Sequence, residues 1–486
     1  MRRSEFQLFA LLCGCLAASV GCSPSVGRSR HTTGDMKGGD GMTATGPGLD
    51  FSQCENLACA VQACSGGSPT SLSGTVFDPA GTTPLYNVSV YVPNAALADI
   101  PDGITTTGTC SSCEPLSGNP IAVVQTDSHG HFTLNNVPSG ANIPVVFQTG
   151  KFRRSITIAN VTACQDNPIG QKDSNGAEML TRLPRSQAEG HLPLMAITTG
   201  GCEGLECVVR TYGFDDSEFT TSTGTGRIHL YTGIGGGEAT GGPSTPDETE
   251  AYAFWGSDNM YKYDMILNSC ECSPHPRDSM GPAYTNMQTY LDHGGRQFTS
   301  DYQYNWFTDT QAPAEFKAAA KWTPNQMAPE YSAPYFVDQT FPKGVALNDW
   351  LQFVFASNMP PPTGQITLLS LFYNVTGINP GTTRWIYDTA NGMIADDTAT
   401  NYTSKYISFN LPFSANATAD AGAPTQCGRA VFADVHVSDG AHATVFPTGC
   451  QSLTKNQQVT AFEFLFFDLG SCVQDDSSPP MPPPIQ

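Results

Sequence analysis

Residues 263–269 read Y-D-M-I-L-N-S, a short apolar run that indicates a buried β-strand. A helix is predicted next, with Pro282 in its first turn and the glycines at 294–295 ending it. Its apolar stripe consists of Tyr284, Met287 and Leu291. Residues 297–299 then open another strand. A strand, a helix and a further strand in this order predict a parallel sheet with covering helices.

The same alternation continues on both sides of this stretch. Strands are predicted at 193–198, 227–232 and 429–436, one helix from Leu205, and a last helix that starts at Thr454 with Gln457 completing a capping box. We therefore expect residues 190–475 to form a doubly wound, flavodoxin-like α/β domain. Residues from about 364 to 412 break the alternation and predict a β region inserted before the last core strand.

Residues 68–185 show an all-β pattern instead. Residues 84–92 alternate apolar and polar side chains, and Gly130 lies in a turn between Thr126 and Phe132 that predicts a hairpin. The fold class expected for the whole chain is thus multidomain α+β, with an N-terminal β-sandwich followed by the α/β domain.

Two sets of motifs carry family resemblances. G-x-V-x-D-P at 74–79, P-L-x-N-V-x-V at 84–90, T-D-x-x-G-x-F-x-L at 126–134 and V-P-x-G at 137–140 resemble the carboxypeptidase regulatory-like, transthyretin-type β-sandwich. That resemblance implies a non-catalytic spacer or adhesion module. Y-D-M-I-L-x-S-C from 263, G-G-R-x-F from 294 and G-R-A-V-F-x-D-x-H from 428 resemble the glutamine amidotransferase-like fold in its trehalose-utilisation-type branch.

The N-terminus reads as an export signal. Arg2 and Arg3 precede an uncharged apolar stretch over residues 6–20, and Ser19-Val20-Gly21-Cys22 resembles the lipobox of bacterial lipoproteins. The resemblance implies a signal peptide over 1–22, acylation of Cys22 and, because Ser23 follows it, an outer-membrane or cell-surface location. An ordinary cleaved signal is the alternative. Residues 23–53 are predicted to be a flexible tether and the Pro-rich segment 476–486 a disordered tail.

The cysteines and the net charge fit an exported protein. The chain has 16 cysteines, and without Cys13, Cys15 and Cys22 an odd number remains, so at least one thiol stays unpaired within a single chain. We expect disulfides in the Cys-rich segment 54–67 and a small clip between Cys110 and Cys113. The net charge of −21 argues against a nucleic-acid partner. The predicted partners are the membrane, through the lipid, and a glycan or another envelope component.

Ligands of doubly wound sheets bind beyond the carboxyl ends of the strands. Carboxylates and aromatic rings in these loops suit sugars, which predicts a glycan-binding site. The alternative is that the aromatic residues only cover the end of the sheet. The candidate ligand-binding residues are Glu203, Glu271, Asp301, Tyr302, Tyr304, Trp306, Asp434 and His436.

Catalysis is the alternative function. The amidotransferase resemblance implies a nucleophilic cysteine after the G-G at 294, but the chain has none there. Ser300 or Cys270 could replace it as the nucleophile, with His436 as the base. His129 with His131, and Asp434 with His436, are the best short metal-binding pairs, but we expect no metal and no cofactor. The sequence therefore favours a non-catalytic binding lipoprotein over an envelope hydrolase or amidase.

Overall fold

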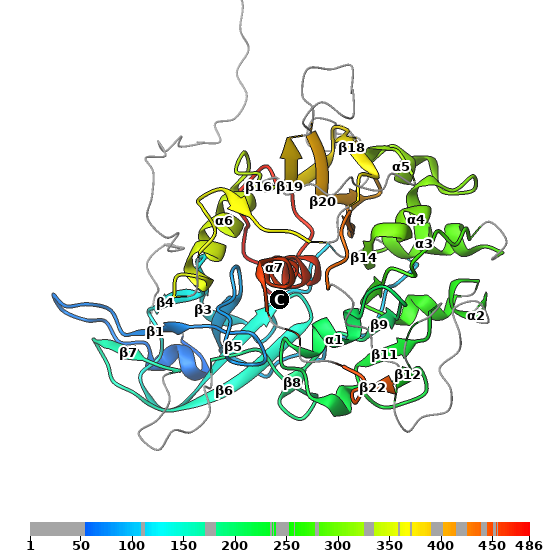
Figure 1. Cartoon of the computed structure of the whole chain (residues 1–486). Coiled ribbons are helices and arrows are strands. Elements are labelled where there is room, and N and C mark those ends of the chain that lie inside the picture. The colour runs from blue at the N-terminus through cyan, green and yellow to red at the C-terminus, as the bar shows by residue number, and fades with distance from the viewer. Residues whose placement is uncertain are drawn as a thin grey trace, which may run out of the picture. The chain divides into compact units, whose positions relative to one another are not determined.

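The computed structural model describes residues 54–107, 112–170, 181–233, 236, 238–239, 252–256, 258–277, 281–324, 335–357, 360–369, 372–389, 402–414, 425–438, 445–450, 453 and 455–486 (Figure 1). Residues 52–486 form one compact unit. The predicted signal peptide, Cys22 and the tether lie outside the described residues. In the part of the chain that is described, no helix is both long and apolar enough to cross a membrane.

The largest sheet among the described residues has ten strands in the order β10-β11-β9-β13-β14-β21-β20-β19-β16-β17. Its first six strands pair in parallel. They are β10 (Phe219–Thr221), β11 (Ile228–Tyr231), β9 (Met195–Thr198), β13 (Met265–Asn268), β14 (Arg296–Ser300) and β21 (Gly428–Ala433). The chain order reverses at β9, which lies between β11 and β13, so this half of the sheet has a topological switch point.

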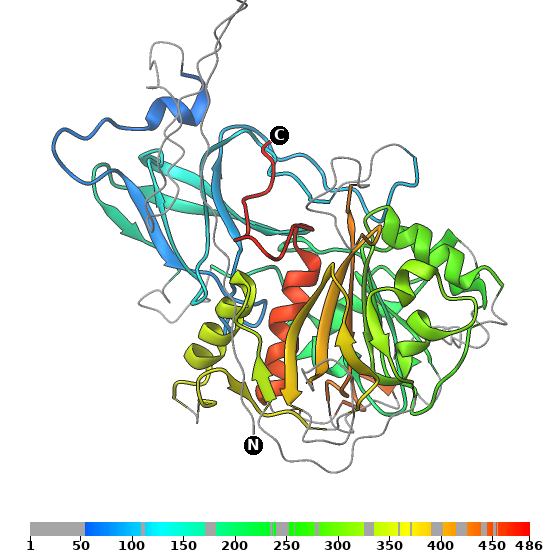
Figure 2. The ribbon, with the colours of Figure 1, turned by 90° about the horizontal axis from the view of Figure 1, so that it is seen from above.

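Residues of each parallel strand alternate between two cores, one on each face of the sheet. Met195 and Ile197 join one hydrophobic cluster, while Ala196 between them joins the other. The first cluster includes α1 (Leu205–Arg210) and α7 (Gln457–Gly470), and the second includes α3 (Ala283–Asp292) and α4 (Asn305–Thr308). Figure 2 shows α7 and α3 on opposite sides of the strands. Helices therefore cover both faces of the parallel half.

The inserted region continues the sheet with antiparallel strands. They are β20 (Tyr402–Leu411), β19 (Thr382–Thr389), β16 (Tyr335–Val337) and β17 (Gln365–Ile366). A separate pair, β15 (Ala320–Trp322) with β18 (Val375–Ile378), lies in the same region of the chain. The helix α6 (Pro342–Val354), which the sequence analysis did not predict, starts with a proline at its N-terminal end. The β insertion thus begins earlier in the chain than residue 364.

The remaining described elements are short. They are η2 (Asn56–Ala60), η3 (Asp216–Glu218), α2 (Tyr252–Trp255), η4 (Asp258–Lys262), η5 (Asp301–Tyr304), α5 (Ala314–Lys317), and the paired strands β12 (Glu238–Ala239) and β22 (Val445–Phe446).

The N-terminal part contains two sheets, as expected for a sandwich. One has the order β4-β1-β7, and the other β3-β2-β5-β6-β8. Their bounds are β1 (Ser71–Thr75), β2 (Ser89–Pro93), β3 (Pro120–Gln125), β4 (His131–Asn135), β5 (Gly140–Thr149), β6 (Phe152–Val161), β7 (Asp166–Pro168) and β8 (Gly190–His191). Leu72 and Phe132 from the first sheet share a core with Val90 and Phe147 from the second.

The turn at 126–131 is not a hairpin, which corrects the sequence interpretation. Gly130 has a positive φ of 73° and its N–H bonds the carbonyl of Asp127, so the tight turn exists. However, β3 pairs with β2 and β4 pairs with β1, so the two strands that the turn joins belong to different sheets. The turn residues in the sequence predict that the chain reverses its direction here, but they do not determine which strands pair with each other.

The disulfides also differ from the predicted clip. The described bridges are Cys54–Cys59, Cys64–Cys164, Cys113–Cys472, Cys202–Cys272 and Cys207–Cys450. Cys113 therefore does not pair with Cys110, although the two are close in sequence. It joins the sandwich to the segment that follows α7, because the fold brings these distant segments together.

Two further expectations for the C-terminal region are wrong. The helix α7 begins at Gln457 rather than at Thr454, because Asn456 is its N-cap and accepts a hydrogen bond from the Val459 N–H at 2.9 Å. The tail is not disordered: Leu116 N–H bonds the carbonyl of Pro484 at 2.8 Å, and Gln486 N–H bonds the carbonyl of Leu116 at 2.9 Å. Asp476 adds buried ion pairs with Arg429 and Lys343.

Candidate functional site

Three side chains from the carboxyl ends of neighbouring strands meet at one point of the α/β unit. Cys270 follows β13, Asp301 directly follows β14, and His436 follows β21. These strands are adjacent in the order β13-β14-β21, and parallel strands end at the same edge of the sheet. The site thus lies where doubly wound sheets bind ligands, beside the switch point at β9.

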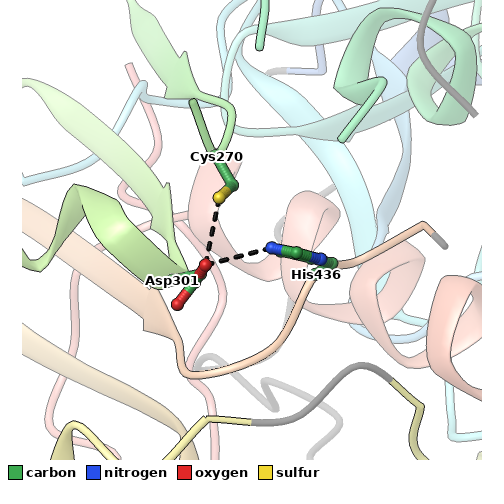
Figure 3. A group of neighbouring side chains, drawn as sticks. All are labelled: Cys270, Asp301 and His436. Carbon is green, nitrogen blue, oxygen red and sulfur yellow. Dashed lines mark hydrogen bonds and ion pairs between the residues drawn. The ribbon is translucent and has the colours of Figure 1, made fainter. Parts of the chain in front are cut away.

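The carboxylate of Asp301 is the centre of the cluster. The thiol of Cys270 donates a hydrogen bond to Asp301 Oδ2 at 3.0 Å, and His436 Nε2 lies 3.0 Å from the same oxygen (Figure 3). Cys270 and Asp301 are fully buried, whereas the His436 side chain keeps 14% of its surface exposed. His436 is therefore the member of the cluster that contacts solvent.

The backbone at Asp301 is strained. Its φ is +42°, a left-handed conformation that non-glycine residues adopt infrequently, and it is the first residue of η5, directly after the extended Ser300. A strand that turns sharply into a helix projects the side chain at the turn away from the sheet end. Strain of this kind costs about 1–3 kcal/mol and concentrates at functional sites.

Glu203, from the loop between β9 and α1, holds all three segments of the cluster. Its Oε2 accepts the backbone N–H of Cys270 at 3.0 Å and the hydroxyl of Ser300, and its Oε1 accepts the backbone N–H of Val437 at 2.5 Å. These donors are Cys270 itself and the residues next to Asp301 and His436. The buried carboxylate thus fixes the backbone at Cys270 and beside His436 and the side chain beside Asp301, without joining the cluster itself.

Burial strongly affects the protonation of these groups. Burial, together with the nearby Asp301 and Glu203 carboxylates, raises the pKa of the Cys270 thiol far above its usual range. Burial also raises the pKa of Glu203, although His436 and the donors around Glu203 oppose this shift. Cys270 therefore stays a neutral thiol near pH 7 in this structure, and a thiol is a poor nucleophile.

Cys270 is the one free cysteine among those that the structure describes. Its neighbour Cys272 pairs with Cys202 instead, and that disulfide joins the loops after β9 and β13. The sequence shows an odd number of cysteines, but only the fold identifies the one that is left over.

The other nucleophile candidate, Ser300, is fully buried at the end of β14 and donates its hydroxyl to Glu203. It has no contact with His436 in this structure that would activate it as a nucleophile. The structure thus does not pair Ser300 with His436. The serine–histidine hydrogen bond in the loop after β13 joins Ser273 to His275 instead, at 2.9 Å, and this bond is exposed.

Two of the predicted aromatic ligands are part of the core. Tyr304 and Trp306 are 2% and 0% exposed, and Trp306 packs against Trp255 with ring centroids 5.0 Å apart. Tyr302 is half-buried, and its ring lies 5.6 Å from that of Phe372, which in turn lies 5.0 Å from His436. Tyr302 and Phe372 therefore form an aromatic border at the exposed side of the cluster.

The remaining acidic candidates have structural partners. Glu271 is buried and forms an ion pair with Arg277 at 3.7 Å. Asp434 accepts hydrogen bonds from the backbone and side-chain N–H groups of Asn374, both at 2.8 Å. Burial raises the pKa of Asp434 to about 6. Asp434 thus attaches the inserted strands to the end of β21, while His436 turns toward Asp301.

The comparisons with known proteins add no family. No protein-family model matches the chain, and no curated protein matches it. Two similar solved structures are type II cohesin–X-dockerin complexes from Acetivibrio cellulolyticus, one a C-terminal and one an N-terminal interface mutant. They are 20% and 16% identical over 32% of this chain and 76% of theirs, each with a TM-score of 0.14. So low a TM-score supports no conclusion about fold or function.

Proposed function

We propose that this chain is an exported, lipid-anchored hydrolase of the bacterial outer membrane or cell surface, whose active site is the cluster of Cys270, Asp301 and His436. Export is supported by the disulfides, since bridged cysteines persist in oxidising compartments. Anchoring through Cys22 and the flavodoxin-like class of the parallel half are part of the same proposal.

One observation carries the enzymatic part: a buried carboxylate on a strained strand-to-helix turn contacts a partly exposed imidazole at the carboxyl edge of the sheet. Ionisable groups with perturbed environments at such an edge are typical of active sites. The burial of Tyr304 and Trp306 removes two of the rings on which a glycan could stack. The geometry thus supports the hydrolase alternative better than a non-catalytic glycan-binding module.

The nucleophile in this proposal is a water molecule. The neutral thiol of Cys270 and the buried hydroxyl of Ser300 are both unsuited to attack a substrate. Asp301 and His436 activate the water, and Tyr302 and Phe372 border the approach to it. Positioned acid–base groups typically accelerate such reactions about 10²–10⁴-fold.

The test uses the purified protein with its disulfides formed and a panel of chromogenic esters, phosphoesters, anilides and glycosides. We expect wild type to hydrolyse at least one class, and Asp301→Asn and His436→Gln to lower kcat about 10²–10⁴-fold. His293→Gln is the matched histidine control, because His293 lies at the end of α3 and bonds the carbonyl of Thr289. No turnover by wild type, or full activity in both variants, would contradict the proposal.

A further inference from the structure

We propose that Cys270, Asp301 and His436 bind one zinc ion, a site that the sequence analysis did not predict. Each residue offers one ligand atom, and the three atoms lie within 4.8 Å of one another. Figure 3 shows the thiol sulfur, a carboxylate oxygen and an imidazole nitrogen directed toward the same region. Small shifts of these side chains suffice to place all three around one ion.

The mixture of donors selects the ion. A thiolate, an imidazole and a carboxylate are the ligands of Zn²⁺, whereas Mg²⁺ and Ca²⁺ prefer oxygen ligands alone. Three protein ligands leave one position of a tetrahedral zinc ion for water, which is the arrangement of catalytic rather than structural zinc sites.

The charge of the surroundings favours a cation. Asp301 and Glu203 are fully buried, and in the described part of the chain neither forms an ion pair with a lysine or an arginine. Asp301 Oδ1 is buried and has no hydrogen-bond partner among the described residues. Buried carboxylate oxygens are normally satisfied, so Oδ1 of Asp301 can still accept a hydrogen bond or a cation.

The site is held in place before any ion binds. Glu203 fixes the backbone at Cys270 and Val437 and the side chain of Ser300. Residues that hold the metal ligands in place without contacting the ion typically improve the affinity for the metal about 10–100-fold. An ion would enter past His436, the partly exposed ligand, and binding would release the thiol proton of Cys270 to solvent.

This inference rests on the proposed function and deepens it, because Asp301 and His436 would then activate the water through the ion that they hold. Zinc lowers the pKa of a bound water to about 7, so that the water loses a proton and becomes hydroxide. The proton of the water would pass to bulk solvent. The hydroxide oxygen would bond to the electrophilic atom of the substrate, the bond to the leaving group would break, and the leaving group would take up a proton from solvent.

Binding of the metal alone tests the site. Chelator-treated, full-length protein is titrated with ZnCl₂ and with CoCl₂, and bound metal is counted after dialysis. We expect one ion per chain, a sulfur-to-cobalt charge-transfer band in the Co²⁺ form, and a loss of affinity of at least about 100-fold in Cys270→Ser, Asp301→Asn and His436→Gln. His293→Gln is the matched control that keeps wild-type affinity.

Sub-stoichiometric binding, a Co²⁺ form without the sulfur band, or unchanged affinity in the three variants would overturn the zinc site. If a variant fails to fold, the cobalt spectrum of wild type decides the question alone. Hydrolysis that persists in excess chelator refutes the zinc site and leaves the proposed function standing. Stoichiometric zinc on these three residues without turnover of any substrate class refutes the proposed function and leaves the zinc site standing.

Discussion

Replacing Glu203 with glutamine tests whether one buried carboxylate organises the whole site. Glu203 accepts three hydrogen bonds, from Cys270 N, Val437 N and Ser300 Oγ. A glutamine of the same shape has a single oxygen, so in either orientation its NH₂ group faces one of the two backbone N–H donors. Glu203→Gln therefore leaves at least one buried N–H without an acceptor.

The expected cost follows from these bonds. A hydrogen bond to a charged acceptor contributes about 1.5–3 kcal/mol, and a buried unsatisfied donor costs about 1–3 kcal/mol. Glutamine avoids the burial of a charge, which offsets part of this loss. We expect the free energy of unfolding to fall by about 2–3 kcal/mol. Ser300→Ala is the control, because it removes the hydroxyl and keeps both backbone bonds, and it should cost about 1 kcal/mol or less.

Guanidinium unfolding measures the stability, and hydrogen exchange locates the effect. In Glu203→Gln, the Cys270 or Val437 amide should exchange about 10-fold faster or more relative to amides in the centre of β13, since 1.4 kcal/mol corresponds to a factor of ten. A stability change below about 0.5 kcal/mol with both amides still protected would refute the view that Glu203 holds the cluster together.

Three further predictions concern groups outside the cluster. Because burial raises the pKa of Asp434 from 3.8 to about 6, its contribution to stability is largest below pH 4 and is lost as the pH rises through 6. The unfolding free energy of wild type relative to Asp434→Asn should thus fall by about 3 kcal/mol between pH 4 and 7, and a flat difference would contradict this. Trp306→Ala should cost about 3–5 kcal/mol in guanidinium unfolding, because the ring is fully buried, whereas a surface ligand residue would leave stability unchanged. Cys472→Ser should cost about 2–5 kcal/mol and raise amide exchange at Leu116 and Gln486, and protection equal to wild type would show that the tail pairs without the disulfide.

The sequence specified much of the α/β framework because local patterns determine it. The apolar runs at 193–198, 227–232 and 263–269 coincide with β9, β11 and β13, and the stripe through Met287 coincides with α3. In each of these elements the buried residues recur with the period of a strand or a helix. The pattern that predicts the element therefore lies within a few positions of the chain.

Long-range contacts account for what the sequence could not predict. Cys113 pairs with a residue 359 positions away. Cys270 stays a free thiol while its neighbour Cys272 forms a disulfide with Cys202. Asp301 and His436 were both candidate ligands, yet no periodicity places them 3.0 Å apart. The burial of Trp306 under Trp255 likewise depends on a packing partner that local composition does not reveal.

The bond between Cys113 and Cys472 has a consequence for biogenesis. A ribosome releases residue 113 long before residue 472, so the sandwich must wait with an unmatched sulfhydryl until residue 472 has been synthesised. Truncated products that stop short of residue 472 expose that sulfhydryl permanently and lack the strand pairing at Leu116. Thiol chemistry alone therefore distinguishes fragments that stop before residue 472 from chains that extend past it.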